Sequence, residues 1–358
     1  MTAFLSMKTQ FENAGDVLIN RELIRLCAEW GDVVVDVTRC PPEFLRSLDL
    51  ARHAPDVRQT TSVGLFGAML KTRLRGQPAY YFLSPGGYFG ERRGLSALAL
   101  VANTAVIAAM RLVGVRVCHV GVSFERLGPF HKRMLQLRAR LLHRLIVRDD
   151  ASAAYAQDNG IRHAGVSPDL AFGAAAYARP GERGRHIAIS FRSDQTPAQG
   201  DEVMRLVQAL DAVLPVDEDF RLVAQVARDC PLMDNVAQSL RGSRRRVETM
   251  YVHGDVDAAL AAYHGCRAVV SNRLHALLFG VLGGCTPVAV ISDSVNAKIG
   301  GLWATLGLPV LSLEGEPGLV LEALRSSETV ETAKLADQQR NALQRTFGAL
   351  LRPAMQGG

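Results

Sequence analysis

Short aliphatic runs that alternate with Ala- and Leu-rich stretches constrain this chain more than any other feature. The runs are apolar at consecutive positions, which is typical of strands buried on both faces of a parallel sheet. The stretches between them repeat apolar residues at helical spacing, as crossover helices do. The predicted strands are Val33–Val37, Ala79–Leu83, Val115–Val120, Leu145–Val147, His186–Ser190, Arg221–Val226, Val247–Val252, Ala268–Val270 and Val288–Ile291.

The order of these elements predicts an α/β protein with two Rossmann-like domains facing a cleft. A small, charged segment with Pro and Gly near residues 175–185 precedes a fresh strand and marks the boundary. We therefore expect domains over residues 1–180 and 181–330, followed by a polar helical segment, 331–358, that packs across them. Predicted helices include Val17–Glu29, Leu95–Leu112, Asp201–Val213 and Val256–His264.

The composition fits a globular protein with aliphatic cores. Apolar residues make up 48% of the 358 residues and aromatic residues 6%, which is too apolar for a disordered chain. The six cysteines are scattered and none stands in a Cys-x-x-Cys pair, so they indicate buried thiols in a reducing compartment. The beginning of the sequence contains Lys8 and Glu12 and lacks the apolar core of a signal peptide. We expect a cytoplasmic protein.

The net charge of +6 comes from arginine-rich clusters such as Lys71–Arg75, His131–Arg144 and Arg241–Arg246. Basic surfaces attract phosphorylated substrates, anionic lipids or nucleic acid. Because no nucleic-acid-binding module is recognisable, we expect no nucleic-acid partner. The basic, amphipathic stretch Pro129–Ile146 predicts a helix packed on a sheet, or alternatively a peripheral contact with the inner face of a membrane. The most apolar window, Leu95–Val115, is interpreted as a buried helix.

The segment from Cys266 to Val290 is the most informative for chemistry. Its strand runs into Ser271 and Asn272, which are good N-cap residues, so Arg273 and His275 are expected in the first turn of an apolar helix. A helix N-terminus attracts anions, and the guanidinium group adds a fork of donors suited to phosphate or carboxylate. His275 adds a group that can act as a general acid. The alternative is structural, with Arg273 in a salt bridge and His275 facing the core.

Glycines stand at the ends of two further predicted strands. Asn13, Gly15 and Asp16 read as a strand-to-helix turn, in which Gly15 permits close backbone approach and Asp16 caps the helix. Gly86 and Gly87 predict a glycine turn after the strand Ala79–Leu83. These are substrate-site candidates, with a purely structural cap or turn as the alternative.

Two basic residues also follow predicted strands. Arg192 ends the strand that begins at His186, and we expect its side chain to overhang the cleft. Lys298 follows the strand Val288–Ile291. For each of them the alternative is a solvated surface charge.

No metal site is predicted. The acidic pair at Asp255 and Asp257 resembles the metal motif of some glycosyltransferases, but it opens a helix, where acids are common. The absence of His-Glu-x-x-His, P-loop and Gly-x-Ser-x-Gly sequences excludes zinc proteases, P-loop kinases and ordinary serine esterases.

Taken together and in order, these segments resemble the polysaccharide pyruvyl transferases. The similarity runs from about residue 11 to about residue 308, and Ser271-Asn-Arg-Leu-His275 carries most of it. Its other parts are Asn13–Asp16, the Gly86-Gly87 turn, Gly121 to Pro129, Val147–Asp149, Pro168–Leu170, the strand ending at Arg192, Gly284–Pro287 and Lys298.

The resemblance implies a glycosyltransferase-B-like fold with the acceptor on the N-terminal domain and the donor on the C-terminal one. It implies that the enolpyruvyl group of phosphoenolpyruvate is transferred to a sugar of a polysaccharide or lipid-linked oligosaccharide precursor, forming a pyruvate ketal and releasing phosphate. Arg192 and Arg273 would bind the donor, His275 would be the general acid, and Asp16 is the candidate acceptor base. The remaining substrate-site candidates are Ser271, Asn272, Lys298, Asn13, Gly15, Gly86 and Gly87. No cofactor is expected, since phosphoenolpyruvate is a substrate.

Two other functions stay open on sequence grounds. One is a nucleotide-sugar glycosyltransferase of the same fold, although Ala276–Gly284 contains no acid to grip a ribose. The other is a non-catalytic family member that binds glycan. The presence of both Arg273 and His275 favours the pyruvyl transferase.

Overall fold

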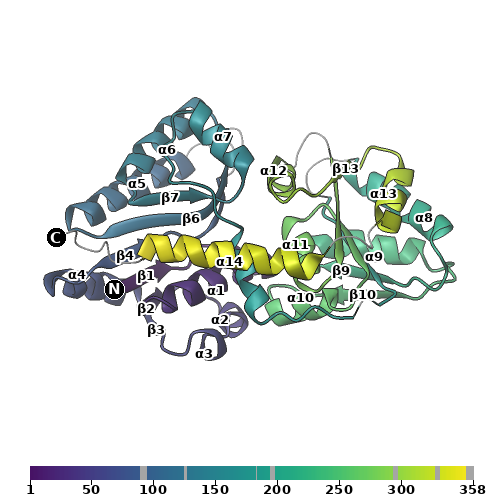
Figure 1. Ribbon diagram of the computed structural model, residues 1–358, viewed down its shortest axis with the longest axis horizontal. Coiled ribbons are helices and arrows are strands. Elements are labelled where there is room, and N and C mark those ends of the chain that lie inside the picture. The colour runs from purple at the N-terminus through teal and green to yellow at the C-terminus, as the bar shows by residue number, and fades with distance from the viewer. Residues whose placement is uncertain are drawn as a thin grey trace. The chain divides into compact units, whose positions relative to one another are not determined.

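The computed structural model describes residues 1–88, 95–124, 127–182, 184–193, 198–292, 297–326 and 331–351. Strands and helices alternate along the chain (Figure 1). They form two compact units, the first built from residues 1–9, 19–170 and the chain from Asn341 onward, the second from residues 10–18 and 171–340. Each unit has its own sheet. The continuous domain boundaries expected at residues 180 and 330 stay predictions.

The first unit is built on a parallel sheet in the order β3-β2-β1-β4-β6-β5, with β7 also paired to β6. Central strands are buried on both faces, as the apolar runs predict. The strands are β1 (Thr2–Ser6), β2 (Asp32–Asp36), β3 (Arg58–Thr60), β4 (Ala79–Phe82), β5 (Gly86–Tyr88), β6 (Arg116–Phe124) and β7 (Arg144–Val147).

Helices cover both faces of this sheet, and the alternation of side chains along β4 shows how. Tyr81 belongs to one core cluster with side chains from α4, α5 and α6, so these three helices lie on the same face. Phe82 points the other way and stacks on Phe347 of α14. The helices in this part of the chain are α1 (Ala14–Ala28), α2 (Pro42–Leu48), α3 (Leu50–His53), α4 (Ser62–Leu74), α5 (Leu95–Leu112), α6 (Pro129–Leu141), α7 (Asp150–Asp158) and α14 (Thr332–Leu351).

The second unit has a parallel sheet in the order β10-β9-β8-β11-β12-β13, which places β8 and β11 side by side at its centre. The reversal of strand order beside β8 is where open α/β sheets commonly bind ligands, beyond the carboxyl ends of the strands. The strands are β8 (Ile187–Ser190), β9 (Phe220–Ala224), β10 (Val247–Tyr251), β11 (Ala268–Ser271), β12 (Thr286–Ile291) and β13 (Val310–Ser312).

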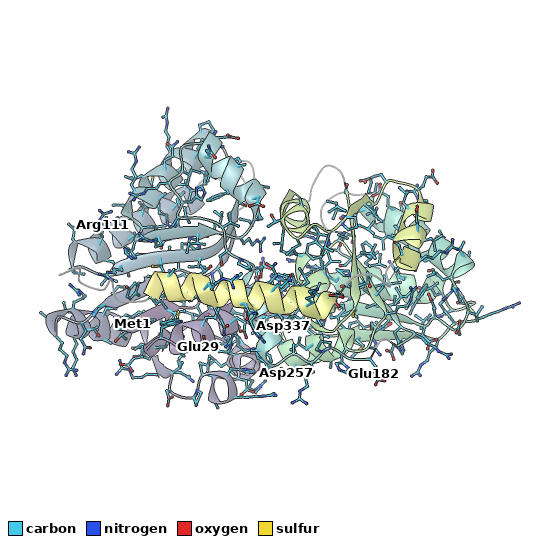
Figure 2. All side chains as sticks on the ribbon, in the orientation of Figure 1. Met1, Glu29, Arg111, Glu182, Asp257 and Asp337 are labelled. Atoms are coloured by element: carbon cyan, nitrogen blue, oxygen red, sulfur yellow. The ribbon has the colours of Figure 1, made fainter. Side chains whose placement is uncertain are left out.

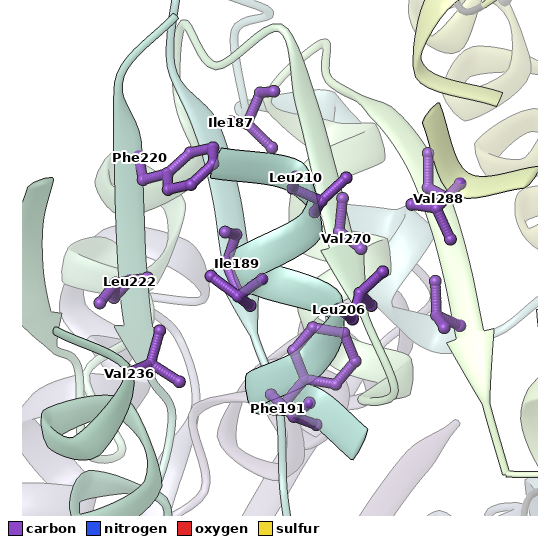
Figure 3. Packing of buried hydrophobic residues seen from close by; sticks show 14 of the residues in the cluster. Ile187, Ile189, Phe191, Leu206, Leu210, Phe220, Leu222, Val236, Val270 and Val288 are labelled. Carbon is purple, nitrogen blue, oxygen red and sulfur yellow. The ribbon is translucent and has the colours of Figure 1, made fainter. Parts of the chain in front are cut away.

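Aliphatic and aromatic side chains from this sheet and from α8 interlock in one core (Figure 3). Phe191 and Phe220 are fully buried there, and Leu206 and Leu210 of α8 pack over them. The helices are α8 (Gln199–Val213), α9 (Cys230–Ser239), α10 (Val256–Tyr263), α11 (Leu274–Leu282), α12 (Ala297–Thr305) and α13 (Pro317–Arg325), with short 3-10 helices at Leu170–Ala176 and Ala227–Asp229.

The α/β class with two parallel sheets is confirmed, and every predicted strand coincides with an observed one. Two local predictions were wrong. Gly86 and Gly87 do not form a turn, because they belong to β5 and pair with β6. The stretch from Leu95 forms a helix, α5, but it is not buried, since Leu98 and Leu112 are exposed. Among the described residues no helix is long and apolar enough to cross a membrane.

Candidate functional site

The turn between β11 and α11 is the centre of the candidate site. The hydroxyl of Ser271, the last residue of β11, donates to the carbonyl of Ser190 on β8 and accepts the N–H of Arg273 at 2.9 Å. Arg273 itself occupies the N-cap position in an extended conformation. The expectation that Ser271 and Asn272 cap the helix was therefore wrong, because both side chains are engaged elsewhere.

Asn272 joins this turn to the end of β8. Its side-chain oxygen accepts the N–H of Arg192 at 2.9 Å, and its side-chain nitrogen donates to the carbonyl of the same residue, also at 2.9 Å. An amide that satisfies both backbone groups of one residue fixes that residue against the turn. Arg192 thus follows β8 at the carboxyl edge of the sheet, and its side chain is half-buried.

Arg273 is held by an acid that the sequence did not single out. Its Nη2 forms a buried ion pair with Asp229 Oδ1, and the two side chains are only 6% and 1% exposed. Asp229 follows β9 and immediately precedes α9. A charged residue just beyond a strand end was the available signal, but nothing in its spacing points to Arg273.

The charges around this pair are predominantly positive. Burial lowers the pKa of Arg273, Asp229 opposes that shift, and the nearby Arg192 and Arg228 lower it further. Burial also raises the pKa of Asp229 against the attraction of Arg273. The guanidinium groups of Arg192 and Arg228 therefore act on that of Arg273, and Asp229 is the buried carboxylate that the described residues pair with it. Such an excess of positive charge favours an anion.

The exposed Arg228 connects this cluster to the segment 10–18. Its Nη2 donates to Gln10 Oε1 at 3.3 Å. At Gly254 an added Cβ would lie 2.9 Å from the carbonyl of Phe11, so the backbone of the segment also runs close to the loop after β10. Residues 10–18 are accordingly part of the same unit as Arg273.

His275 lies in the first turn of α11 and is half-buried, not sealed in the core. A Cβ added to Gly15 would overlap the Cγ and Nδ1 atoms of the His275 ring. Only glycine can therefore bring the backbone of residue 15 this close to the imidazole. The predicted close approach at Gly15 is present, and its partner is the candidate general acid.

Asn13, rather than Asp16, is the residue that caps α1. Its side-chain oxygen accepts the N–H of Gly15 at 3.1 Å, and the helix begins at Ala14. The prediction that Asp16 is the cap was therefore wrong. Asp16 lies in the first helical turn, half-buried, one residue after the glycine that contacts His275.

The remaining candidates are distributed unevenly. Gly86 and Gly87 belong to the first unit, whereas all the other described candidates belong to the second. Lys298 lies at the start of α12, but its side chain falls outside the described residues. Within the described residues, no group of three or more His, Cys, Asp or Glu side chains could hold a metal ion.

The arrangement resembles a receptor for a small, multiply charged anion beside a titratable ring. The first hydrogen bond within α11 is donated by Leu277 to the carbonyl of Arg273, so earlier N–H groups of the helix lie at its positive end. Arg192 is half-buried and Arg228 is exposed, whereas Arg273 is buried. His275 adds proton-transfer chemistry at the same helix end.

Comparison with known proteins gives a family and a fold. The family model for polysaccharide pyruvyl transferase matches residues 13–294. Comparison with curated proteins gives no match.

Solved structures resemble the whole chain at low sequence identity. HepE of Anabaena, solved in complex with UDP, has a TM-score of 0.55 at 15% identity, with 98% of each chain covered. The UDP-GlcNAc 2-epimerase of Methanocaldococcus jannaschii has a TM-score of 0.61 at 10% identity, covering 99% of this chain and all of its own. A putative UDP-N-acetylglucosamine 2-epimerase of Listeria monocytogenes has a TM-score of 0.56 at 13% identity, covering 98% and 95%. These similarities identify a glycosyltransferase-B-like fold with two Rossmann-like domains.

Proposed function

This chain belongs to the polysaccharide pyruvyl transferase family, and from that membership we propose that it transfers the enolpyruvyl group of phosphoenolpyruvate to a sugar. The acceptor in this proposal is a polysaccharide or lipid-linked oligosaccharide precursor, and the product is a pyruvate ketal. The protein would work in the cytoplasm, where phosphoenolpyruvate is the donor substrate and no further cofactor takes part.

The observation that carries the donor assignment is the excess of positive charge at the N-terminus of α11. Phosphoenolpyruvate bears a carboxylate and a phosphate, both of which match guanidinium groups and helix N–H groups. Arg273 is anchored by Asp229, so its charge is fixed in place and its Nε forms no hydrogen bond among the described residues. Arg192, half-buried and held by Asn272, supplies the second guanidinium group.

His275 is proposed as the acid that protonates the methylene carbon of the donor. Protonation leaves an oxocarbenium-like centre at C2, which a sugar hydroxyl oxygen attacks. The bond from C2 to the phosphate oxygen then breaks, and a second hydroxyl closes the ketal. Of the two hydroxyl protons, one replaces the proton that His275 gave to the methyl group, and the other leaves with phosphate. Asp16, in the helical turn next to His275, is the proposed acceptor of hydroxyl protons.

A nucleotide-sugar donor is the alternative that the experiment must also test. Several solved structures of this fold were determined with UDP or a UDP-sugar, so a nucleotide-sugar donor is chemically reasonable for the fold. Against it, α11 contains no acid that could bind a ribose hydroxyl. A third outcome is a protein that binds glycan without turnover.

The deciding experiment measures phosphate release from phosphoenolpyruvate in the presence of methyl glycosides of galactose, glucose and mannose. In deuterated water, NMR should detect a ketal methyl group carrying one deuterium, because the proton on the methylene carbon comes from an exchangeable acid. Release of UDP from UDP-sugars would instead indicate a glycosyltransferase. Glycoside binding without release of either product would indicate a binding protein.

Variants separate the proposed roles. His275→Gln should lower kcat by about 10²–10⁴-fold and leave phosphoenolpyruvate binding, measured by calorimetry, nearly unchanged. Arg192→Ala should mainly weaken that binding. Arg241→Ala, which removes an exposed guanidinium group elsewhere in the same unit, is the matched control and should change neither quantity.

A further inference from the structure

Helix α4 in the first unit presents a row of apolar side chains to solvent. Val63, Phe66, Leu70 and Leu74 recur at helical spacing and are 51–83% exposed. The opposite side of the same helix buries Leu65 and Met69 in the core, so the row is a second apolar face. Single exposed apolar residues are ordinary, but a continuous row indicates a surface that is covered in use.

The neighbouring helix α5 repeats this pattern. It buries Ile107 and Met110 in the same core cluster as α4. Its other side exposes a set of aliphatic residues, of which Leu112 is 88% exposed. The exposed set on α5 and the following turn is Leu98, Val101, Val106, Leu112 and Val113. The sequence suggested a buried helix here, and the structure instead has a helix that is apolar on both sides.

Helices α4, α5 and α6 all pack on one face of the sheet, where they share a core cluster. α5 packs on α6 (Figure 1). Arg111 lies at the end of α5 (Figure 2), and its Nη1 atom donates to the carbonyl of Arg140 at the end of α6. A Cβ added to Gly114, just after α5, would lie 2.8 Å from an Arg73 Nη atom of α4. The carboxyl ends of the three helices therefore converge. α6 adds the exposed Phe130 and Leu137.

The charged residues within these three helices have one sign. The three helices contain seven Lys and Arg residues and no Asp or Glu. The whole chain has a net charge of +6, so these +7 leave −1 for all the remaining residues. All seven side chains except that of Arg138 are exposed or half-buried. The basic residues are Lys71, Arg73, Arg111, Lys132, Arg133, Arg138 and Arg140, and the exposed Arg75 follows α4.

We propose that the face formed by α4, α5 and α6 docks on a membrane surface rich in anionic lipids. Apolar side chains flanked by Lys and Arg match the interface between lipid headgroups and acyl chains. In this proposal the protein lies on the membrane surface, and none of the described helices is long and apolar enough to span it. A second copy of this chain is a poor alternative occupant, because two such faces would bring like charges together. An acidic partner protein would also complement the basic residues. A face adapted only to such a partner would not bind anionic vesicles in preference to neutral ones.

This docking is independent of the donor chemistry, since it depends only on the surface of the first unit. It gives the proposed function a location, because a lipid-linked acceptor is carried by the same membrane. Failure of the phosphate-release assay would leave the docking intact. Loss of docking would leave turnover on a soluble methyl glycoside intact.

The test is co-sedimentation of the full chain with vesicles of phosphatidylcholine alone and of phosphatidylcholine mixed with phosphatidylglycerol. We expect binding to the mixed vesicles, much weaker binding to the neutral ones, and weakening as salt rises. Lys71→Gln combined with Arg75→Gln should lower the partition coefficient by about 25-fold, at about 5-fold for each basic residue. Phe66→Ser combined with Leu70→Ser should lower it by about tenfold or more.

Matched variants in the second unit are the controls. Arg241→Gln with Arg244→Gln removes the same charge from exposed positions. Val213→Ser with Leu319→Ser removes apolar residues that are each 51% exposed, as Phe66 is. Neither pair should change binding by more than about twofold, since neither lies on the proposed face. Thermal unfolding of each variant shows that the fold is retained.

Three results would overturn the proposal. The first is equal binding to neutral and anionic vesicles, or to neither. The second is an equal loss of vesicle binding in the control variants. Binding would then depend on net charge or on total exposed apolar surface and not on this face. The third is a dimer, detected by light scattering, that Phe66→Ser with Leu70→Ser dissociates, because the face would then be a contact between copies of this chain.

Discussion

The carboxylate of Asp229 is buried against the guanidinium group of Arg273, the N-cap residue of α11. Two consequences follow from this relationship. The ion pair fixes a positive charge at the positive end of a helix, a position that would otherwise repel it. It also leaves Nε of the guanidinium group without a hydrogen bond among the described residues.

Removing the acid alone should destabilise the protein strongly. We expect Asp229→Ala to lower the free energy of unfolding by roughly 3–5 kcal/mol, because it leaves a buried guanidinium group uncompensated. Adding Arg273→Met should restore much of that loss. Urea unfolding of the two single variants and the double variant measures the coupling.

The exposed pair of Arg46 and Glu43, with side chains 73% and 74% exposed, is the control. Glu43→Ala should cost less than about 0.5 kcal/mol, since exposed ion pairs contribute little. A similar cost at both acids would show that burial of Asp229 does not matter.

Asn272 should act on the donor through Arg192, since its amide binds both backbone groups of that residue. We expect Asn272→Ala to raise the KM for phosphoenolpyruvate by about tenfold, the effect of roughly one or two lost hydrogen bonds, with a smaller change in kcat. In an Arg192→Ala background the same substitution should have almost no further effect. Additive effects on KM would show that Asn272 acts by another route.

The strands were predictable because buried parallel strands leave a continuous apolar run in the sequence. The strands that the sequence did not reveal, β1, β3, β5 and β13, span three to five residues each. Pairing with neighbours determines them: β1 lies between β2 and β4, and β5 is a strand only because Gly86 and Gly87 pair with β6. Glycine disfavours strands, so local preference pointed to a turn.

The site was predictable in its charges and not in its contacts. Residues at the ends of β8 and β11 meet at one sheet edge in any parallel sheet, which is why Arg192 and Arg273 could be paired from the sequence. Asp229 and Arg273 are distant in sequence, and their contact depends on how the two side chains are oriented in the folded protein. No sequence pattern reveals that orientation. Gly15 signalled a close approach, but only the tertiary structure identifies His275 as its partner.

Gly15→Ala tests whether this approach matters for turnover. The added methyl group would overlap the His275 ring, so the ring must move. We expect kcat to fall on the order of 100-fold, because a displacement of about 1 Å of a catalytic group has effects of that size. In a His275→Ala background the substitution should cost little more, which a steady-state assay would reveal.

Gly67→Ala is the matched control, since a Cβ there meets nothing within 4 Å and the residue lies inside α4. It should leave kcat unchanged and stabilise the helix by about 0.5–1 kcal/mol. A comparable loss of kcat in both variants would attribute the Gly15 effect to a general sensitivity to substitution.

His119 should make the protein less stable in mild acid. It is buried in β6, with Nε2 3.0 Å from the carbonyl oxygen of Ser84, and burial, reinforced by the positive charge of Arg138, lowers its pKa to about 3. The unfolded chain takes up this proton near the ordinary pKa of about 6.5. The stability contributed by neutral His119 is therefore fully present above that pH and is lost as the pH falls toward 3. At pH 5 the loss amounts to about 2 kcal/mol.

His119→Gln removes the titrating group and keeps an amide donor for the Ser84 carbonyl. Between pH 7.5 and pH 5, the free energy of unfolding of this variant should fall by about 2 kcal/mol less than that of the unsubstituted chain. This difference does not depend on what the substitution itself costs at pH 7.5. His143, whose pKa burial lowers to about 4, is present in both proteins and cancels in the comparison. Urea unfolding at the two pH values measures the difference. Parallel pH profiles would show that the His119 ring accepts a proton in the folded state as readily as in the unfolded one.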